Sequence, residues 1–266
     1  MPATIAQVDV NGRSVHELRG GSGKPLVYLH SAMGESSLWL PYLEALAQTR
    51  EVFAPMHPGF GKSEGIDDIR DIEDYVWHYL AYFDANGWES VDIVGLSLGG
   101  WIAAEIAARY PARVSSMVLT SSVGIWVRDT PIHDIFVVDL DRPETVIGVS
   151  FHDTTCPAAQ MLTAMMAAKN LPDEMLEDIV KARAATAKVG WNPLLHDPRL
   201  ESLLHRVTAR TLCLWGSHDK IVPPVYGETF ARRIPNAELR IVDQCGHLIP
   251  LEKLDAFVDA VRGFVE

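Results

Sequence analysis

The chain has 266 residues, enough for one large domain or for a domain that carries an insertion. Hydrophobic residues make up 48% and charged residues 22%, a composition that predicts a globular core and excludes disorder and fibrous repeats. The 23 Lys and Arg residues against 35 Asp and Glu give a net charge of −12, so we expect neither nucleic acid nor an anionic membrane as a partner.

The sequence also favours a cytoplasmic location. No apolar run approaches the ~20 residues that a membrane-spanning helix needs. The first 18 residues, MPATIAQVDVNGRSVHEL, lack the basic and apolar regions of a secretory signal. Cys156, Cys213 and Cys245 are far apart and odd in number, which is typical of reduced thiols.

Strand and helix patterns alternate through the first half of the chain. Residues 4–10 and 14–19 flank Asn11-Gly12 and predict a β-hairpin. Short apolar runs then predict buried strands, and amphipathic segments between them predict helices. The strands are expected at 25–30, 51–55, 91–95 and 114–120, and the helices at 37–48, 69–86 and 98–110. This alternation predicts a mostly parallel sheet with helices on both faces.

The alternation stops near residue 122 and resumes near residue 206. Between these points the patterns are helical, at 157–170, 172–189 and 198–206. Strands are expected again at 211–216 and 238–242, with helices at 224–233 and 250–265. We therefore predict a core domain of residues 1–122 and 206–266, interrupted by a helical cap at 123–205.

The segment Gly95-Leu96-Ser97-Leu98-Gly99 lies between an apolar strand and an Ala-rich helix. A serine at such a tight turn projects its hydroxyl from the end of the sheet, and the glycines avoid collisions with the neighbouring strand and helix. The alternative is a purely structural turn. In the strand–turn–helix context, the pattern predicts a nucleophilic serine at Ser97.

A serine hydroxyl needs a base to become nucleophilic. We predict His247 as the base because it follows the strand at 238–242 and precedes the last helix. Asp219, after the preceding strand, is the predicted acid, since the order Ser–Asp–His is the one expected for this arrangement. A helix cap is the alternative role for Asp219, and Asp243 is the rival acid.

Acyl transfer also requires hydrogen-bond donors for the developing oxyanion. One predicted donor is the backbone N–H of Leu98, the residue after the nucleophile. The other is the N–H of Ala32, in the loop after the strand at 25–30. His30, in the same loop, is expected to brace the loop rather than to carry a proton.

Taken together, these motifs resemble the α/β-hydrolase superfamily, in the branch with a helical cap between the sixth and seventh strands. The resemblance runs along HSAMG, HPGFGKS, GLSLGG, GSHDKIVPP and GHLIPLEK, and implies an eight-stranded, mostly parallel sheet with Ser97, Asp219 and His247 as a catalytic triad. Ser31 stands where relatives often have glycine, and Met56-His57 replaces a pair that usually contains Asp. The first departure is expected to alter the oxyanion geometry. The second removes a loop-bracing carboxylate, so that loop is expected to be held differently.

The expected cap supplies candidate substrate contacts. Its methionines offer soft apolar surface, although packing of the cap onto the sheet is the commoner role for such side chains. Arg183 either belongs to a solvated face or points inward to a substrate carboxylate, as cap arginines do in relatives that hydrolyse carbon–carbon bonds. The candidate substrate-binding residues are Met33, Trp126, Met161, Met165, Arg183, Trp191 and Leu248.

The leading functional hypothesis is a serine hydrolase of carboxylic esters or lactones of small to medium, largely apolar substrates, with an acyl-enzyme on Ser97. The alternative is hydrolysis of carbon–carbon bonds in vinylogous diketones from aromatic ring cleavage. Against this alternative, Leu248 follows His247 where those relatives carry an aromatic residue. A third possibility is a non-catalytic ligand receptor.

We expect a small molecule as the only partner and a monomer or homodimer as the assembly. No cofactor and no metal is expected, since no two histidines have HxxxH or HxH spacing with a carboxylate partner.

Overall fold

Eight strands form one sheet in the order β1-β2-β4-β3-β5-β6-β7-β8 in the computed structural model, which describes residues 3–137, 142–167 and 172–265. Strands β1 and β2 pair antiparallel, as do β2 and β4, and all other neighbours are parallel. The predicted fold class is confirmed. The strands are β1 (Thr4–Val10), β2 (Arg13–Gly21), β3 (Pro25–Leu29), β4 (Glu51–Pro55), β5 (Val91–Leu96), β6 (Val114–Thr120), β7 (Arg210–Gly216) and β8 (Ala237–Val242).

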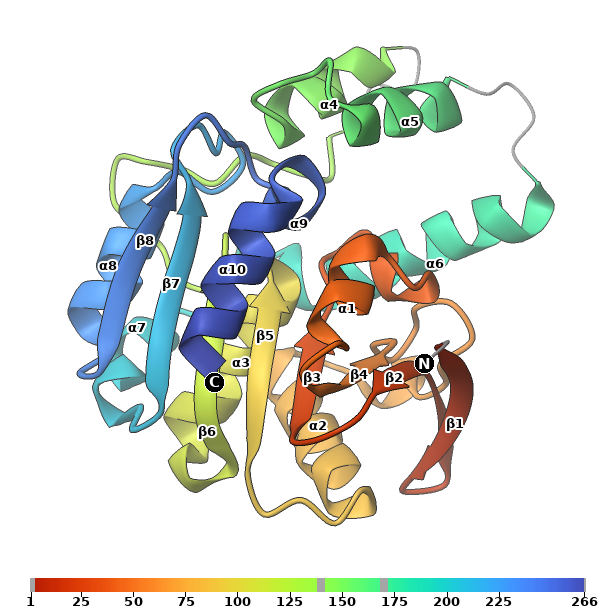
Figure 1. Cartoon of the computed structure of the whole chain (residues 1–266), viewed down its shortest axis with the longest axis vertical. Coiled ribbons are helices and arrows are strands. Elements are labelled where there is room, and N and C mark those ends of the chain that lie inside the picture. Colours follow the sequence, from red (N-terminus) through yellow and green to blue (C-terminus); the bar gives the residue numbers. More distant parts are fainter. Residues whose placement is uncertain (1–2, 138–141, 168–171, 266) are drawn as a thin grey trace.

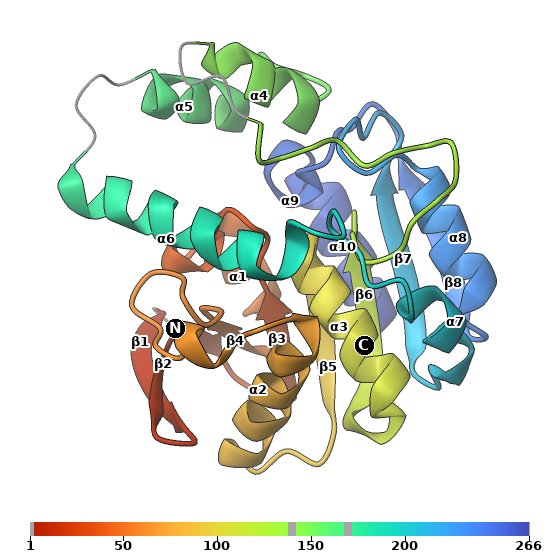
Figure 2. The same cartoon turned by 180° about the vertical axis from the view of Figure 1, so that it is seen from behind.

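Helices cover both faces of this sheet (Figures 1 and 2). On one face, α1 (Pro41–Leu46) lies beside α10 (Leu254–Val265), and α9 (Ile249–Glu252) immediately precedes α10. The other face carries α2 (Ile72–Ala85), α3 (Leu98–Arg109) and α8 (Val225–Arg233). The sheet thus separates two apolar clusters, one under each helical layer.

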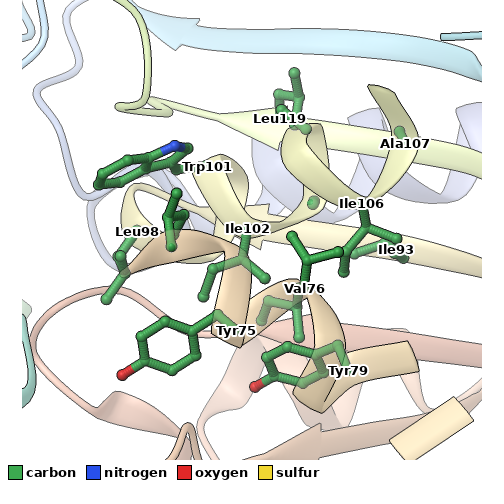
Figure 3. Close-up of a cluster of buried hydrophobic side chains, with 14 of the residues drawn as sticks. Tyr75, Val76, Tyr79, Ile93, Leu98, Trp101, Ile102, Ile106, Ala107 and Leu119 are labelled. Carbon is green, nitrogen blue, oxygen red and sulfur yellow. The ribbon is translucent and has the colours of Figure 1, made fainter. Parts of the chain in front are cut away.

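The core under the second layer centres on α3 (Figure 3). Ile102 and Ile106 on α3 and Tyr75 and Tyr79 on α2 are all buried. Together they close the space between the helices and the sheet. Because α3 follows Ser97 directly, its packing fixes the direction in which that residue leaves the sheet.

Two helix boundaries differ from their predicted positions for local reasons. The helix expected at 37–48 begins at Pro41, which occupies its first turn, after a separate 3-10 turn (Glu35–Ser37). The helix expected at 69–86 begins at Ile72, because the Asp71 side chain accepts hydrogen bonds from the N–H groups of Glu73 and Asp74.

Between β6 and β7 the chain forms α4 (Pro143–Ser150), α5 (Pro157–Met166), α6 (Asp173–Gly190) and α7 (Leu200–Leu203). Helices α4, α5 and α6 lie beyond the carboxyl ends of the central strands (Figures 1 and 2). The helix expected at 157–170 ends at Met166 in the structure, and residues 168–170 lie outside the described residues.

Helix α4 has no counterpart among the predicted helices. Its sequence, PETVIGVS, holds four β-branched residues and a glycine, which have low helix propensity. The limits predicted for the cap, 123 and 205, remain a prediction. Near both limits the chain packs into the core of the sheet, since Ile125, Leu200 and Leu204 belong to the same buried cluster as Trp101.

Within the described part of the chain, none of the helices combines the length and the apolar character that crossing a bilayer requires.

We expect Ile102→Ala to lower the free energy of unfolding by about 2–5 kcal/mol, because the lost methyl groups leave a cavity in a fully buried site. The matched control is Ile5→Ala on β1, where the side chain is 71% exposed and the change is expected within about 0.5 kcal/mol. Urea unfolding of the three proteins measures both values. Equal stabilities of the two variants would contradict the central place given to α3.

Candidate active site

Ser97 occupies the turn between β5 and α3. Its backbone angles are φ 53° and ψ −108°, an uncommon conformation for a residue with a side chain. The Ser97 N–H donates to the Thr120 carbonyl at 2.9 Å, which ties the turn to β6. At this strained turn, Ser97 lines a cavity.

The glycines around Ser97 permit this turn by letting backbones approach closely. A Cβ on Gly99 would lie 2.0 Å from the Leu29 carbonyl oxygen at the end of β3. A Cβ on Gly95 would lie 2.5 Å from the Gly99 carbonyl oxygen. Real Cβ atoms do not approach backbone this closely, so both positions require glycine.

Asp219 and His247 come together after β7 and β8. The His247 Nδ1 lies 2.9 Å from Asp219 Oδ2 and 3.2 Å from Oδ1, and both residues are buried. The N–H groups of Ile221 and Val222 also donate to Asp219 Oδ1, at 2.9 and 2.8 Å. Asp219 therefore orients the imidazole with Nδ1 as the donor, which leaves Nε2 as an acceptor.

The rival carboxylate, Asp243, makes a different contact. It accepts a hydrogen bond from the Ser217 hydroxyl at 3.2 Å. No hydrogen bond between Asp243 and His247 occurs in the described structure. The geometry thus favours Asp219 as the partner of His247.

Ser97 and His247 line the same cavity, whose volume is about 410 Å³. The Ser97 hydroxyl forms no hydrogen bond with any residue that the structure describes, so it is open to a molecule in the cavity. Such hydroxyl–imidazole contacts commonly tighten only when substrate binds. The arrangement can support proton transfer from the serine to the imidazole.

The predicted oxyanion donors lie on either side of Ser97. Ala32 lines the cavity, and Leu98 is the first residue of α3, so its N–H has no acceptor within the helix. The loop that carries Ala32 is fixed by Ser31, whose N–H and hydroxyl donate to the Glu35 carboxylate at 2.8 and 2.6 Å. Met33 N–H in turn donates to the Ser31 hydroxyl at 3.1 Å. Ser31, the departure from the usual glycine, is thus a structural part of this loop.

Two buried histidines hold this loop against the loop after β4. His30 Nε2 accepts the His57 N–H at 2.9 Å, and His57 Nε2 donates to the His30 carbonyl at 2.9 Å. His30 Nδ1 also lies 2.7 Å from the Ser31 carbonyl, and His57 Nδ1 pairs with the Tyr79 hydroxyl. Burial lowers the pKa of both histidines, that of His57 well below 6.5. His57 therefore braces the loop after β4, and His30 braces its own loop as expected.

Of the predicted substrate contacts, Met33, Arg183 and Leu248 line the cavity. The other four do not line it, and their role as substrate contacts stays a prediction. Trp126 stacks with His196 at 5.3 Å, and Trp191 lies 5.2 Å from the Phe136 ring and is 64% exposed. Met161 is exposed on α5, and Met165 packs against the core on the α10 side. Helical spacing alone does not reveal which face of a cap helix turns toward the serine.

Most of the remaining wall comes from a stretch that the sequence patterns did not single out. It runs from the end of the loop after β6 into α4, and its lining residues are His133, Ile135, Phe136, Val137, Arg142, Thr145, Val146, Val149 and Ser150. Thr186 and Ile221 complete the wall. The apolar run at 135–137 is a signal in the sequence that could have indicated a place in the cavity wall.

We expect Gly99→Ala to destabilise the protein by about 1–3 kcal/mol or more and to abolish turnover, because the new Cβ collides with the Leu29 carbonyl. The matched control is Gly263→Ala in α10, where nothing lies within 4 Å of the added Cβ, and stability should rise slightly. Thermal unfolding and an activity assay test both. A Gly99→Ala protein as active as the parent would refute the close-approach argument.

The buried histidines also predict a stability that depends on pH. Because the pKa of His30 and of His57 is lower in the folded than in the unfolded chain, unfolding takes up protons in acid. The contribution of these two histidines to the free energy of unfolding should therefore be constant above about pH 7 and decrease as the pH falls through 6.5, the unfolded value.

Urea titrations between pH 8 and pH 5 measure this slope. His57→Gln should reduce it by up to about one proton, whereas His205→Gln, at an exposed position, should leave it unchanged. An unchanged slope in His57→Gln would show that His57 is not kept neutral by burial.

Comparison with known proteins places this geometry in a family. The family model described as "alpha/beta hydrolase fold" matches residues 24–254. A 2-hydroxymuconate semialdehyde hydrolase of Pseudomonas putida is 30% identical over 223 residues, which cover 82% of this chain and 78% of that protein. The acetyltransferase component of an acetoin-cleaving system, also from Pseudomonas putida, is 31% identical over 268 residues, 97% of this chain and 68% of that one.

Among solved structures, a 2-hydroxy-6-oxo-6-phenylhexa-2,4-dienoate hydrolase from Rhodococcus sp. strain RHA1 is similar with a TM-score of 0.80. It is 24% identical, and the alignment covers 99% of both chains, which supports the fold. The match of the family model over most of the sequence, together with the sheet order and the serine turn, shows that the chain belongs to the alpha/beta hydrolase fold family.

Proposed function

We propose that this protein is a serine hydrolase that cleaves carbon–carbon bonds beside a ketone in vinylogous 1,5-diketones that carry a carboxylate. The observation that carries the proposal is the position of Arg183, which lines the same cavity as Ser97 and His247. The sequence favoured ester hydrolysis instead. The names of similar proteins, among them a semialdehyde hydrolase and a dienoate hydrolase, support the carbon–carbon alternative.

Arg183 suits a substrate carboxylate because it is positively charged and because hydrogen bonds hold its guanidinium in place. One of its terminal nitrogens, Nη2, donates to the carbonyls of Ile135 and Phe136 at 3.3 and 3.0 Å. These bonds hold the guanidinium at the cavity wall, while its other N–H groups have no partner among the described residues. The described lining contains no Asp or Glu, although the chain has 35 of them. An anionic group therefore meets no like charge in the lining, and a guanidinium can bind it with two parallel hydrogen bonds.

In this proposal the reaction begins at Ser97. His247 accepts the hydroxyl proton, Asp219 stabilises the imidazolium, and the serine oxygen attacks the ketone carbon. The N–H groups of Ala32 and Leu98 hold the oxyanion. The carbon–carbon bond then breaks, and its electron pair passes through the conjugated alkene to the oxygen of the second ketone, which forms a dienolate beside the carboxylate near Arg183.

The proton held by His247 completes the first product, and the acyl group stays on Ser97. A water molecule, deprotonated by the same histidine, then attacks the acyl carbon and releases a carboxylic acid. The sum is one diketone and one water converted to two products, with no redox change. The apolar wall of Val146, Val149 and Leu248 would contact the remainder of the substrate.

Ester hydrolysis is the second candidate, and Leu248 favours it. Leu248 lines the cavity directly after His247, where carbon–carbon hydrolases of this fold commonly carry an aromatic side chain. An ester needs the same triad and the same oxyanion donors but no arginine. The two reactions therefore differ in whether activity depends on Arg183.

We expect a higher kcat/KM on a 2-hydroxy-6-oxo-dienoate than on p-nitrophenyl acetate. Ser97→Ala should abolish both reactions while changing the melting temperature little. Arg183→Gln should lower kcat/KM on the dienoate about 10- to 100-fold, because a charge-assisted hydrogen-bond pair is worth about 1.5–3 kcal/mol, and should leave the ester rate within about twofold. Steady-state kinetics on both substrates measures these effects.

Lys181→Gln is the matched control, since Lys181 lies on the same helix, pairs with Glu177 and does not line the cavity. Ester turnover that exceeds dienoate turnover and is indifferent to Arg183 would favour the second candidate. Tight binding of either compound by the parent protein without turnover would indicate the receptor alternative.

A further inference from the structure

The carboxylate of Glu252 lies where three backbone N–H groups converge. Its Oε2 accepts the N–H of Gly246 at 2.7 Å and that of His152 at 3.2 Å, and its Oε1 accepts the N–H of Asp153 at 2.6 Å. Glu252 ends α9, five residues after His247, whereas His152 and Asp153 follow α4 in the insertion. One side chain thus joins two segments that are about a hundred residues apart in the sequence.

Backbone contacts reinforce this junction. The Ser150 carbonyl accepts the N–H of His247 at 2.9 Å and that of Leu248 at 3.3 Å. A Cβ on Gly246 would lie 2.7 Å from the same carbonyl oxygen, so the two segments are in tight contact. The loop that carries His247 is therefore built against the C-terminal end of α4, and Asp219 alone does not determine its position.

Glu252 itself does not line the cavity, but both segments that it joins do. Val146, Val149 and Ser150 form part of the wall from α4, and His247 and Leu248 belong to the opposite segment. A carboxylate suits this place because it has two acceptor oxygens and no donor when ionised, so it can satisfy all three N–H groups at once. An amide of the same shape presents an acceptor at one end and clashing donors at the other.

We propose that Glu252 is a positioning residue for His247: by holding Gly246 to the 152–153 turn, it fixes the imidazole at the distance from Ser97 that proton transfer requires. The inference rests on the proposed role of His247 as the base. It does not depend on whether the substrate is a diketone or an ester, because both reactions use the same proton transfer.

The test compares Glu252→Gln and Glu252→Ala with the parent protein. Two quantities are measured: kcat and KM on p-nitrophenyl acetate, and the rate at which a fluorophosphonate labels Ser97. The matched control is Glu64→Gln, because Glu64 also accepts a backbone N–H, that of Ser14 at 3.0 Å, but lies outside the cavity lining. Circular dichroism measures the folded fraction of each variant, and all rates are divided by the concentration of folded protein.

We expect kcat and the labelling rate to fall about 10- to 100-fold in Glu252→Ala, since small misplacements of a reacting group have effects of this order. Glu252→Gln, which keeps one acceptor oxygen, should recover part of the loss. KM should stay within about twofold in both variants, because Glu252 is outside the cavity. Glu64→Gln should match the parent in every measurement.

Rates per folded molecule equal to those of the parent in Glu252→Ala would overturn the proposal. So would a rise in KM at unchanged kcat, which would indicate a role in binding. If Glu252→Ala does not fold, Glu252→Gln decides, and a folded glutamine variant with parental kcat and labelling rate overturns the inference. Failure of the parent itself to be labelled at Ser97 would instead contradict the proposed function.

Discussion

The strained turn at Ser97 is the constraint on which the rest of the site depends. A residue with a side chain adopts φ 53° there because β5 ends and α3 begins within one residue, and because β3 lies directly against the start of the helix. The apolar contacts that α3 makes with α2 and with the sheet stabilise the turn. The same turn leaves the first N–H groups of α3 open toward the cavity, where an anion can form. Packing energy far from the site thus maintains a backbone that would not persist alone.

Around this turn, burial and hydrogen-bond partners determine which side chains are charged. Asp219 keeps its acceptor oxygens occupied by an imidazole and by two backbone N–H groups, so its orientation is fixed. His30 and His57 are also buried and hydrogen-bond only to neutral groups, and burial lowers the pKa of both imidazoles, which favours their uncharged form. Among the histidines of the site, then, His247 has both a carboxylate partner and access to the cavity. This combination is what distinguishes a candidate base from a bracing residue.

Several contacts attach the insertion to the core, and two sets of contacts shape the cavity wall. The end of α4 is bound to the His247 loop through Ser150 and Glu252. Helix α6 is bound to the core through Lys188, which donates to the Ile66 carbonyl at 2.7 Å. Arg183 on the same helix donates to the carbonyls of residues 135 and 136, which belong to the insertion itself. The cavity wall therefore has two parts. The end of α4 is bound to the His247 loop, and α6 carries the Arg183 guanidinium. Different contacts of the same insertion thus position Arg183 for the proposed substrate recognition and His247 for the proposed proton transfer.

The sequence by itself determined the alternation of strands and helices, the place of Ser97 at a strand–helix turn and the pairing of His247 with Asp219. These features follow from local patterns and from the rule that parallel strands end at one edge. The tertiary structure alone decided which residues line the cavity. It excluded Trp126, Met161, Met165 and Trp191 and included α4, whose β-branched sequence does not predict a helix. The physical reason is that a helix in an insertion is oriented by its anchoring contacts, such as those of Ser150 and Arg183, and these join residues far apart in the chain.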